Sequence, residues 1–224
     1  DGLLQPSPDS PTNKSKKMAI QPLENYILGV QAEFDRIPPD RSSVLDQLAA
    51  YIQNRLNQSG KADVVCICTH NSRRSHLAQV WAQVAAYHYG IKNINAYSGG
   101  TEVSALNPMA THALEKAGFA VQKLSTGINP VYAFKYHPDE PALIGFSKTY
   151  DDPFNVQNGF IAVMTCSHAD ENCPFIPTAA QRISLSYDDP KDYDGTPQQE
   201  EKYAERCRDI AREMLYVFSK MIKS

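Results

Sequence analysis

Residues 63–81, DVVCICTHNSRRSHLAQVW, decide how the rest of the chain is interpreted. The stretch begins with an apolar run, residues 64–67, which is typical of a buried parallel strand. An apolar-periodic segment begins at Leu77 and indicates a helix. The loop between strand and helix carries a cysteine and an arginine six positions apart, Cys68 and Arg74.

A strand-to-helix loop of this kind can bind an anion. Its successive backbone N–H groups and the positive end of the helix dipole form a socket for a tetrahedral oxyanion. The same field favours a thiolate, so we expect the pKa of Cys68 to be lowered and its sulfur to be nucleophilic. Arg74 can supply two parallel donors to the oxyanion. Ser75 can either cap the helix or donate its hydroxyl to the thiolate. The alternative, a buried structural cysteine beside surface arginines, fits this pattern less well.

CTHNSRRS, residues 68–75, resembles the phosphate-loop signature of the low-molecular-weight protein tyrosine phosphatases and of the thioredoxin-coupled arsenate reductases that share their fold. The resemblance implies an α/β fold, a four-stranded parallel sheet with helices on both faces. It implies that Cys68 is the nucleophile and Arg74 the oxyanion clamp, that Asn71 shapes the loop, and that Ser75 assists the thiolate. The substrate-binding set it implies is Thr69, His70, Asn71, Ser72, Arg73 and Arg74.

A second chemical signal follows a second apolar run, residues 159–164. This run leads into TCSHADENCP, which carries Cys166 and, seven residues later, Cys173. Because the carboxyl ends of parallel strands share one edge, we expect Cys166 to emerge beside Cys68. Three interpretations remain open: a zinc site, a pair of structural thiols, and a thiol relay. The zinc site would use Cys166, His168 and Cys173, but it lacks the closely spaced ligand pairs that zinc sites usually have.

In the relay, Cys166 attacks an adduct at Cys68 and forms a disulfide with it. Cys173 then attacks Cys166 and moves the disulfide away from the loop, which requires the intervening segment to unwind. The spacing of the two cysteines resembles the resolving segment of the thioredoxin-coupled arsenate reductases. We therefore expect a small oxyanion as substrate and thioredoxin or a similar reductant as partner.

An acidic residue precedes Pro190 after a short predicted strand at residues 182–185. Asp189 matches the general acid of the family, which protonates the leaving oxygen. The neighbouring Asp188 is the fallback, and a solvated turn is the alternative. The resemblance thus predicts six catalytic residues, namely Cys68, Arg74, Ser75, Asp189, Cys166 and Cys173.

The remaining chain suggests three parts. Residues 1–17 are rich in Pro, Ser and Lys and predict a flexible tail. Residues 18–60 predict two helices, 23–34 and 43–57, that pack on the core rather than form a dimer interface. The second is expected to begin with a capping box, Ser43 with Asp46, and to stop at Gly60. Residues 61–224 predict the catalytic domain, with an insertion at about 125–158 made of loops, with a hairpin as one option.

Aromatic residues in the insertion have two interpretations. They either anchor a long loop, which we favour, or line a substrate cleft; they are Tyr132, Phe134, Tyr136, Phe146 and Tyr150. A long amphipathic helix is predicted at residues 200–222, and its Cys207 is expected to be an inert packing thiol, as is Cys66 on the first strand.

Composition limits the partners and the location. A net charge of −3 gives no reason to expect nucleic acid or an anionic membrane surface, and there is no apolar run of transmembrane length. No leader segment is visible after Asp1. An odd number of cysteines, five, favours reduced thiols in a cytoplasmic protein over a secreted disulfide framework.

No cofactor or metal is predicted. Potassium, which some arsenate reductases bind, is not expected because Gln79 stands at the helix position.

The sequence therefore predicts an arsenate reductase that reduces arsenate to arsenite through a cysteine relay. The alternative is a low-molecular-weight protein tyrosine phosphatase that hydrolyses phosphotyrosine through a cysteinyl-phosphate. A non-catalytic oxyanion sensor is the third class, which the combination of nucleophile, clamp and acid disfavours.

Overall fold

The structure is a computed structural model that describes residues 21–173 and 175–221. The tail predicted at residues 1–17 lies outside the described residues. The helices are α2 (Gln21–Gln31), α3 (Pro39–Ser59), α4 (Arg74–His88), α5 (Pro108–Ala117), α6 (Ser167–Asn172) and α7 (Gln199–Ser219), with single 3-10 turns at Phe34–Arg36 and Pro190–Tyr193. The strands are β1 (Ala62–Cys68), β2 (Ile94–Gly100), β3 (Ala120–Lys123), β4 (Tyr132–Lys135), β5 (Leu143–Gly145), β6 (Phe160–Met164) and β7 (Ala179–Ser184).

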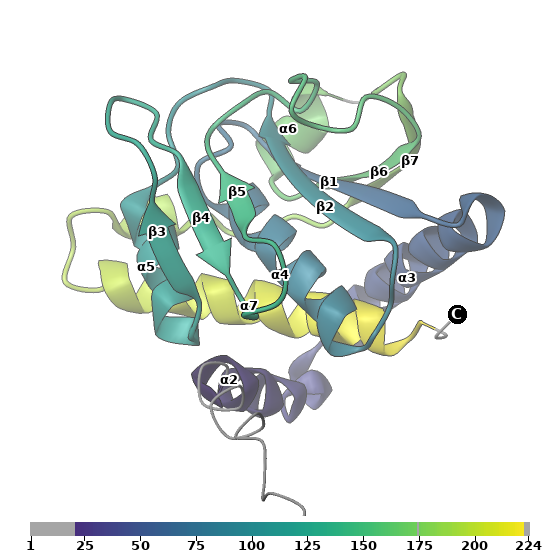
Figure 1. Ribbon diagram of the computed structural model, residues 1–224, viewed down its shortest axis with the longest axis horizontal. Coiled ribbons are helices and arrows are strands. Elements are labelled where there is room, and N and C mark those ends of the chain that lie inside the picture. Colours follow the sequence, from purple (N-terminus) through teal and green to yellow (C-terminus); the bar gives the residue numbers. More distant parts are fainter. Residues whose placement is uncertain (1–20, 174, 222–224) are drawn as a thin grey trace, which may run out of the picture.

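A four-stranded parallel sheet forms the centre of the molecule, with the strand order β2-β1-β6-β7 (Figure 1). This confirms the predicted sheet. The pairs Cys68–Gly100 and Ile67–Met164 set the register on the two sides of β1. The strands after which Cys68 and Cys166 emerge therefore end side by side, which is where open parallel sheets place their sites.

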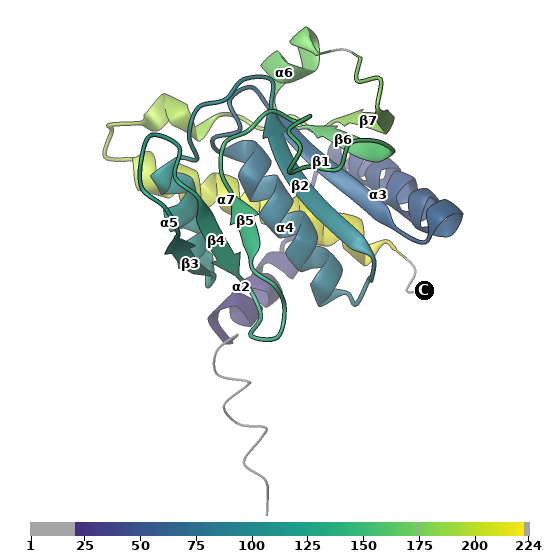
Figure 2. The same ribbon diagram turned by 45° about the horizontal axis from the view of Figure 1, so that its top comes forward.

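The two faces of the sheet bury different layers. On one face, β1 and β6 contribute Val64, Cys66, Ile161 and Val163 to a core shared with α3, α4, α5 and α7. On the other face, Val65, Ile67, Ala162 and Met164 pack with Ala169 of α6 and with loop residues such as Tyr150. Helix α4 lies between the sheet and α7 (Figures 1 and 2). Among the described helices, none is long and apolar enough to cross a membrane.

The two N-terminal helices dock on α7. Glu33, just after α2, accepts hydrogen bonds from Arg208 and Arg212 of α7. Arg41 of α3 forms a two-pronged pair with Glu213 of α7, with distances of 2.8 and 2.9 Å. In the core, Trp81 of α4 stacks on Tyr26 of α2, with ring centroids 5.5 Å apart. The predicted extension is thus joined to α7 by ion pairs and to α4 by aromatic packing.

The start of α3 differs from the prediction. The helix begins at Pro39, with Pro38 as its N-cap, so Ser43 lies inside it and the expected capping box is wrong. A proline fits the first turn, where its missing N–H would have no helical acceptor. The end was predicted correctly, because Gly60 forms the C-cap with a left-handed φ of 72°.

The insertion contains a second, small sheet. Strands β3, β4 and β5 form an antiparallel three-stranded sheet, so the hairpin option is confirmed and β3 precedes the predicted start of the insertion. The side chains of Tyr132, Phe134 and Tyr136 are buried in the main core. These three aromatic residues pack as anchors, as we favoured, and none of them lines the cavities beside Cys68.

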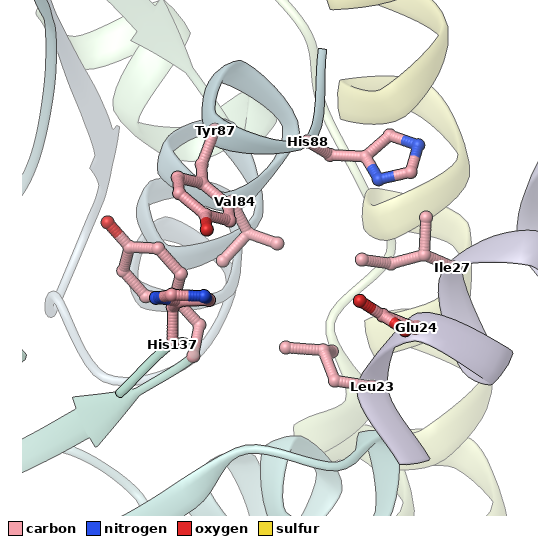
Figure 3. Close-up of a pocket in the computed structure, with 8 residues that line it drawn as sticks. Leu23, Glu24, Ile27, Val84, Tyr87, His88 and His137 are labelled. Carbon is pink, nitrogen blue, oxygen red and sulfur yellow. The ribbon is translucent and has the colours of Figure 1, made fainter. Parts of the chain in front are cut away.

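The insertion and the N-terminal extension meet at helix α4. A cavity of about 290 Å³ lies between them. Figure 3 shows Leu23 and Glu24 of α2 on one side of it, and His137 with Tyr87 of α4 on the other. It is lined by Leu23, Glu24, Ile27, Val84, Tyr87, His88, Tyr136 and His137. None of the predicted site residues lines this cavity, so it is separate from the loop that carries Cys68.

Candidate active site

Cys68, the predicted nucleophile, lies at the end of β1 and is almost fully buried. The Cys68 Sγ is 3.0 Å from the hydroxyl oxygen of Ser75, and Asn71 Nδ2 donates to that same oxygen at 2.8 Å. Because Ser75 accepts from Asn71, its own proton is available to the sulfur. Of the two roles expected for Ser75, the structure supports assistance to the thiolate. The helix N-cap is Arg73, which makes no side-chain cap.

Asn71 holds the shape of the loop. It adopts a left-handed φ of 45°, a conformation that asparagine tolerates better than most residues. Its Oδ1 accepts a hydrogen bond from the backbone N–H of Lys148 at 3.0 Å. Gly100 lies against the same loop, where an added Cβ would be 2.6 Å from the Thr69 carbonyl oxygen. The glycine is therefore required for the close approach of β2 to the loop.

The clamp and the acid are in direct contact. Arg74 Nη2 donates to Asp189 Oδ2 at 2.5 Å, and Nη1 donates to the Tyr187 carbonyl oxygen at 2.9 Å. Asp189 also accepts from the backbone N–H of Lys191. By contrast, the Asp188 side chain is 99% exposed and faces Arg206. The geometry therefore places Asp189, and not the fallback residue, beside the loop.

Arg73 does not direct its charge into the loop. Its guanidinium donates to the Tyr203 hydroxyl at 2.6 Å and to Asp194 at 3.0 Å. The guanidinium is therefore already paired, although Arg73 also lines the small cavity over Cys68, and its predicted role in substrate binding stays a prediction. Its physical role is to tie the loop to α7. His70 is half-exposed and lies 3.4 Å from Glu102, at the rim.

The second cysteine lies next to the loop. Cys166, 1% exposed, follows β6, and its Sγ is 3.5 Å from the hydroxyl of Thr69, the residue after Cys68. Its sulfur also accepts from the Ala169 N–H at 3.3 Å. Cys173 ends α6, is partly exposed, and its backbone N–H bonds to the Ala169 carbonyl. All five cysteines are free thiols.

The zinc interpretation lacks support. Across residues 21–173 and 175–221, no group of three or more His, Cys, Asp or Glu residues is arranged to hold a metal ion. His168 directs its Nδ1 to the Thr69 hydroxyl, at 3.1 Å. Two of the three residues considered as ligands, Cys166 and His168, contact the Thr69 hydroxyl instead.

Two buried groups behind the loop could not be identified from the sequence. His76 is fully buried; its Nε2 lies 3.0 Å from the Asn71 carbonyl oxygen and its Nδ1 3.1 Å from the Ser98 hydroxyl. Burial lowers the pKa of His76 well below its usual value, so the ring is neutral. A neutral ring donates from Nε2 to the carbonyl and accepts at Nδ1 from Ser98, and so links the loop to β2.

Lys148 is the second of these groups, and it lies in the insertion. The residue is 2% exposed, and its ammonium lies 4.7 Å from the centroid of the Phe146 ring. Burial lowers the pKa of Lys148 to about 8. No sequence signal marks it, since it lies in an aperiodic segment that predicts loops.

The space over the nucleophile is small. A cavity of about 10 Å³ is lined by Cys68, His70, Ser72, Arg73, Arg74 and Asp189. Beside it, a more open cavity of about 370 Å³ is lined by Thr69, His70, Arg74, Glu102, His168, Asp189 and Lys191. The described lining of these two cavities contains no Phe, Tyr or Trp. The arrangement can bind a small tetrahedral oxyanion, attack it with a thiolate and protonate a departing oxygen.

Comparisons with known proteins agree with this geometry. Residues 63–134 match the sequence model of the family described as "Low molecular weight phosphotyrosine protein phosphatase". An arsenate reductase of Bacillus licheniformis is 28% identical over 159 residues, which are 71% of this chain and 96% of that relative. An arsenate reductase of Staphylococcus aureus is 29% identical over 131 residues, 58% of this chain and 79% of that relative.

The fold has a counterpart among solved structures. A mutant of YwlE from Bacillus subtilis superposes with a TM-score of 0.51 at 15% identity, covering 71% of this chain and 98% of that one. The parallel sheet carries Cys68 at the end of β1 and Arg74 at the start of α4, an arrangement that could bind an oxyanion beside a cysteine. The match over residues 63–134 and the similarity to the arsenate reductases confirm the resemblance inferred from residues 68–75.

Proposed function

We propose that the protein is an arsenate reductase that reduces arsenate to arsenite through three cysteines. The observation that carries the proposal is the position of Cys166, whose sulfur lies 3.5 Å from the hydroxyl of the loop residue Thr69. Simple phosphoester hydrolysis needs a thiol at the loop but no second thiol beside it. The 25–29% identical curated relatives named arsenate reductases support the same reaction.

In the first step, the Cys68 thiolate attacks arsenic. The oxyanion is held by the loop N–H groups and by Arg74. An arsenate OH group leaves as water after it takes the proton of Asp189. In the described structure Arg74 is paired with Asp189. A bound oxyanion supplies a competing negative charge, which disfavours the ionised Asp189 carboxyl and prepares it as an acid.

In the second step, the Cys166 thiolate attacks Cys68 Sγ. A bond forms between the two sulfurs while the S–As bond breaks, and its electron pair remains on arsenic. Arsenic thus goes from the +5 to the +3 state and leaves as arsenite. The two sulfurs, each oxidised by one electron, form the Cys68–Cys166 disulfide.

In the third step, the disulfide moves outward. Cys173 attacks Cys166 Sγ and releases the Cys68 thiolate. Because Cys166 and Cys173 lie at opposite ends of α6, this six-residue helix must unwind for the sulfurs to align. Cys173 is partly exposed, so the new disulfide is accessible to a protein dithiol. We propose thioredoxin or a similar cytoplasmic protein as that reductant.

The test compares Cys173→Ser with the control Cys207→Ala. Cys207 lies at the far side of the core and accepts a hydrogen bond from Trp81, so its removal should leave turnover intact. We expect Cys173→Ser to release one equivalent of arsenite and then stop with a Cys68–Cys166 disulfide, detected by peptide mass spectrometry. Continued turnover of arsenate by Cys173→Ser would contradict the relay, and absence of arsenite from the unmodified protein would reject the function.

A tyrosine phosphatase is the second candidate. The observation in its favour is Tyr193, which lines a cavity of about 510 Å³ together with Arg74 and Asp189 and offers a ring near the acid. Its test is hydrolysis of an aryl phosphate by the Cys166→Ser, Cys173→Ser double variant. A phosphatase would retain full activity there and would reduce no arsenate.

A further inference from the structure

The hydroxyl of Thr69 lies between a thiol and an imidazole. Its oxygen is 3.5 Å from Cys166 Sγ and 3.1 Å from His168 Nδ1. Thr69 and Cys166 are buried, whereas His168 is exposed and lines the open cavity beside the loop. Three groups that can carry a proton therefore form a line from the buried thiol to the surface.

Cys166 needs a route by which to lose its proton. Only a thiolate attacks another sulfur efficiently, so the proton must leave Cys166 Sγ before the second step. The sulfur is 1% exposed, which denies bulk water direct access. A hydroxyl has one proton to donate and two lone pairs that accept. Thr69 can therefore accept the thiol proton while it donates its own.

We propose that His168 accepts the proton of Cys166 through the Thr69 hydroxyl and thereby generates the thiolate that expels arsenite. This inference rests on the proposed function and concerns its second step only. The S–H proton moves to Thr69 Oγ1, and the hydroxyl proton moves to His168 Nδ1, leaving a thiolate and an imidazolium. The exposed ring then returns the proton to water. Histidine suits this role because its proton exchanges near neutral pH.

The surroundings of His168 carry charges of both signs. Helix α6 also bears Asp170, whose carboxylate is held by Arg182 at 2.5 Å, and Glu171. The other titratable or charged groups around the cavity are His70, Arg74, Glu102, Asp189 and Lys191. His70 is paired with Glu102, and Arg74 with Asp189. Among these titratable side chains around the cavity, His168 is the one whose ring contacts the Thr69 hydroxyl.

The experiment isolates the second step in the Cys173→Ser protein, which stops at the first disulfide. Reduced protein is mixed with arsenate and quenched at set times, and the Cys68–Cys166 disulfide is measured by mass spectrometry between pH 5.5 and 9. His168→Gln should slow disulfide formation about 10–100-fold at pH 7. The rate of His168→Gln should depend on pH more steeply than that of the parent. His137→Gln, a histidine of the insertion, is the matched control and should match the parent.

A rescue measurement separates proton transfer from a structural role. His168→Ala should regain rate with added imidazole, in proportion to the concentration of its neutral form. Thr69→Val should be slow and should not respond to imidazole, because the connecting hydroxyl is gone. If His168→Gln keeps the parent rate and pH profile, or if imidazole fails to restore His168→Ala, the inference is overturned. If the Cys173→Ser parent itself forms no disulfide with arsenate, the proposed function fails instead.

Discussion

Arg74 and Asp189 are 115 residues apart in the chain and in contact at 2.5 Å. One comes from the first turn of α4, the other from the loop after β7. The contact brings the oxyanion clamp and the proposed acid to the same point over Cys68. The loop signature predicts the clamp, but only the parallel order β1-β6-β7 brings the acid to it.

Replacement of Asp189 by Asn should impair the first chemical step. An amide cannot give up a proton to the leaving oxygen, so we expect kcat to fall about 100-fold or more with little change in the affinity for the oxyanion. The measurement is single-turnover kinetics with arsenate, and with an aryl phosphate for comparison. Asp188→Asn is the matched control, because that side chain is 99% exposed. Equal losses in the two variants would contradict the assignment of Asp189.

Lys148→Met should raise stability. Burial lowers the pKa of Lys148 to about 8 from 10.5, so below pH 8 the folded protein carries a poorly solvated charge. As pH falls from 10.5 to 8, the unfolded chain binds a proton at Lys148 before the folded protein does, so the folded protein loses stability. Methionine carries no charge and can pack on Phe146 and Phe154, so it avoids this loss. We expect a gain of about 1–3 kcal/mol at pH 7 that shrinks between pH 8 and 10.5, measured by urea denaturation. Lys123→Met, on an exposed strand, is the control. If the free energies of unfolding of Lys148→Met and of the parent change with pH in parallel, the prediction is refuted.

Glu33→Gln should weaken the attachment of the N-terminal helices. Hydrogen bonds from Arg208 and Arg212 lower the pKa of Glu33 to about 2 from 4.5. The folded pKa is depressed, so the ion pairs stabilise the protein above pH 4.5, and this contribution is lost as pH falls toward 2.

We expect Glu33→Gln to cost about 1–2 kcal/mol at pH 7, a value reduced by solvent screening. The difference from the parent should shrink as pH falls from 4.5 to 2, where about half of the Glu33 carboxyl in the folded parent is protonated. Chemical denaturation at the two pH values measures it. Glu205→Gln, which removes an exposed pair with Lys202, should change stability far less.

The thiols should differ sharply in alkylation. Burial raises the pKa of Cys66, and it raises that of Cys207 to about 12. Both are fully buried, so neither should react with iodoacetamide at pH 8 until the protein is denatured. Cys173, which is partly exposed, should react in the native protein. Peptide mapping after timed alkylation tests this order, and early labelling of Cys207 would contradict it.

Local sequence patterns predicted the elements that build the site. The apolar runs before Cys68 and Cys166 predicted two parallel strands, which the structure confirms as β1 and β6. The start of α3 was misplaced because Ser43 with Asp46 resembles a capping box, whereas the helix already begins at Pro39.

Long-range contacts explain what the sequence could not predict. The strands of the small sheet are three or four residues long and pair across loops, so no periodicity reveals them. Arg73 and Arg74 are neighbours with the same chemistry. Only the helix turn and the position of α7 direct the first to Asp194 and the second to Asp189. Likewise His168 was considered as a metal ligand because the sequence does not show that Thr69 lies beside it.

The docking of α2 and α3 on α7 has a consequence for biosynthesis. A ribosome releases residues 21–59 long before residues 199–219, which supply much of their packing surface. Until the last helix emerges, the apolar sides of the first two have no complete partner. Contacts between distant parts of a chain form slowly and leave apolar surface exposed meanwhile. We therefore expect nascent chains that end before residue 199 to depend on chaperones for solubility, and the final helix to complete the fold in a single late step.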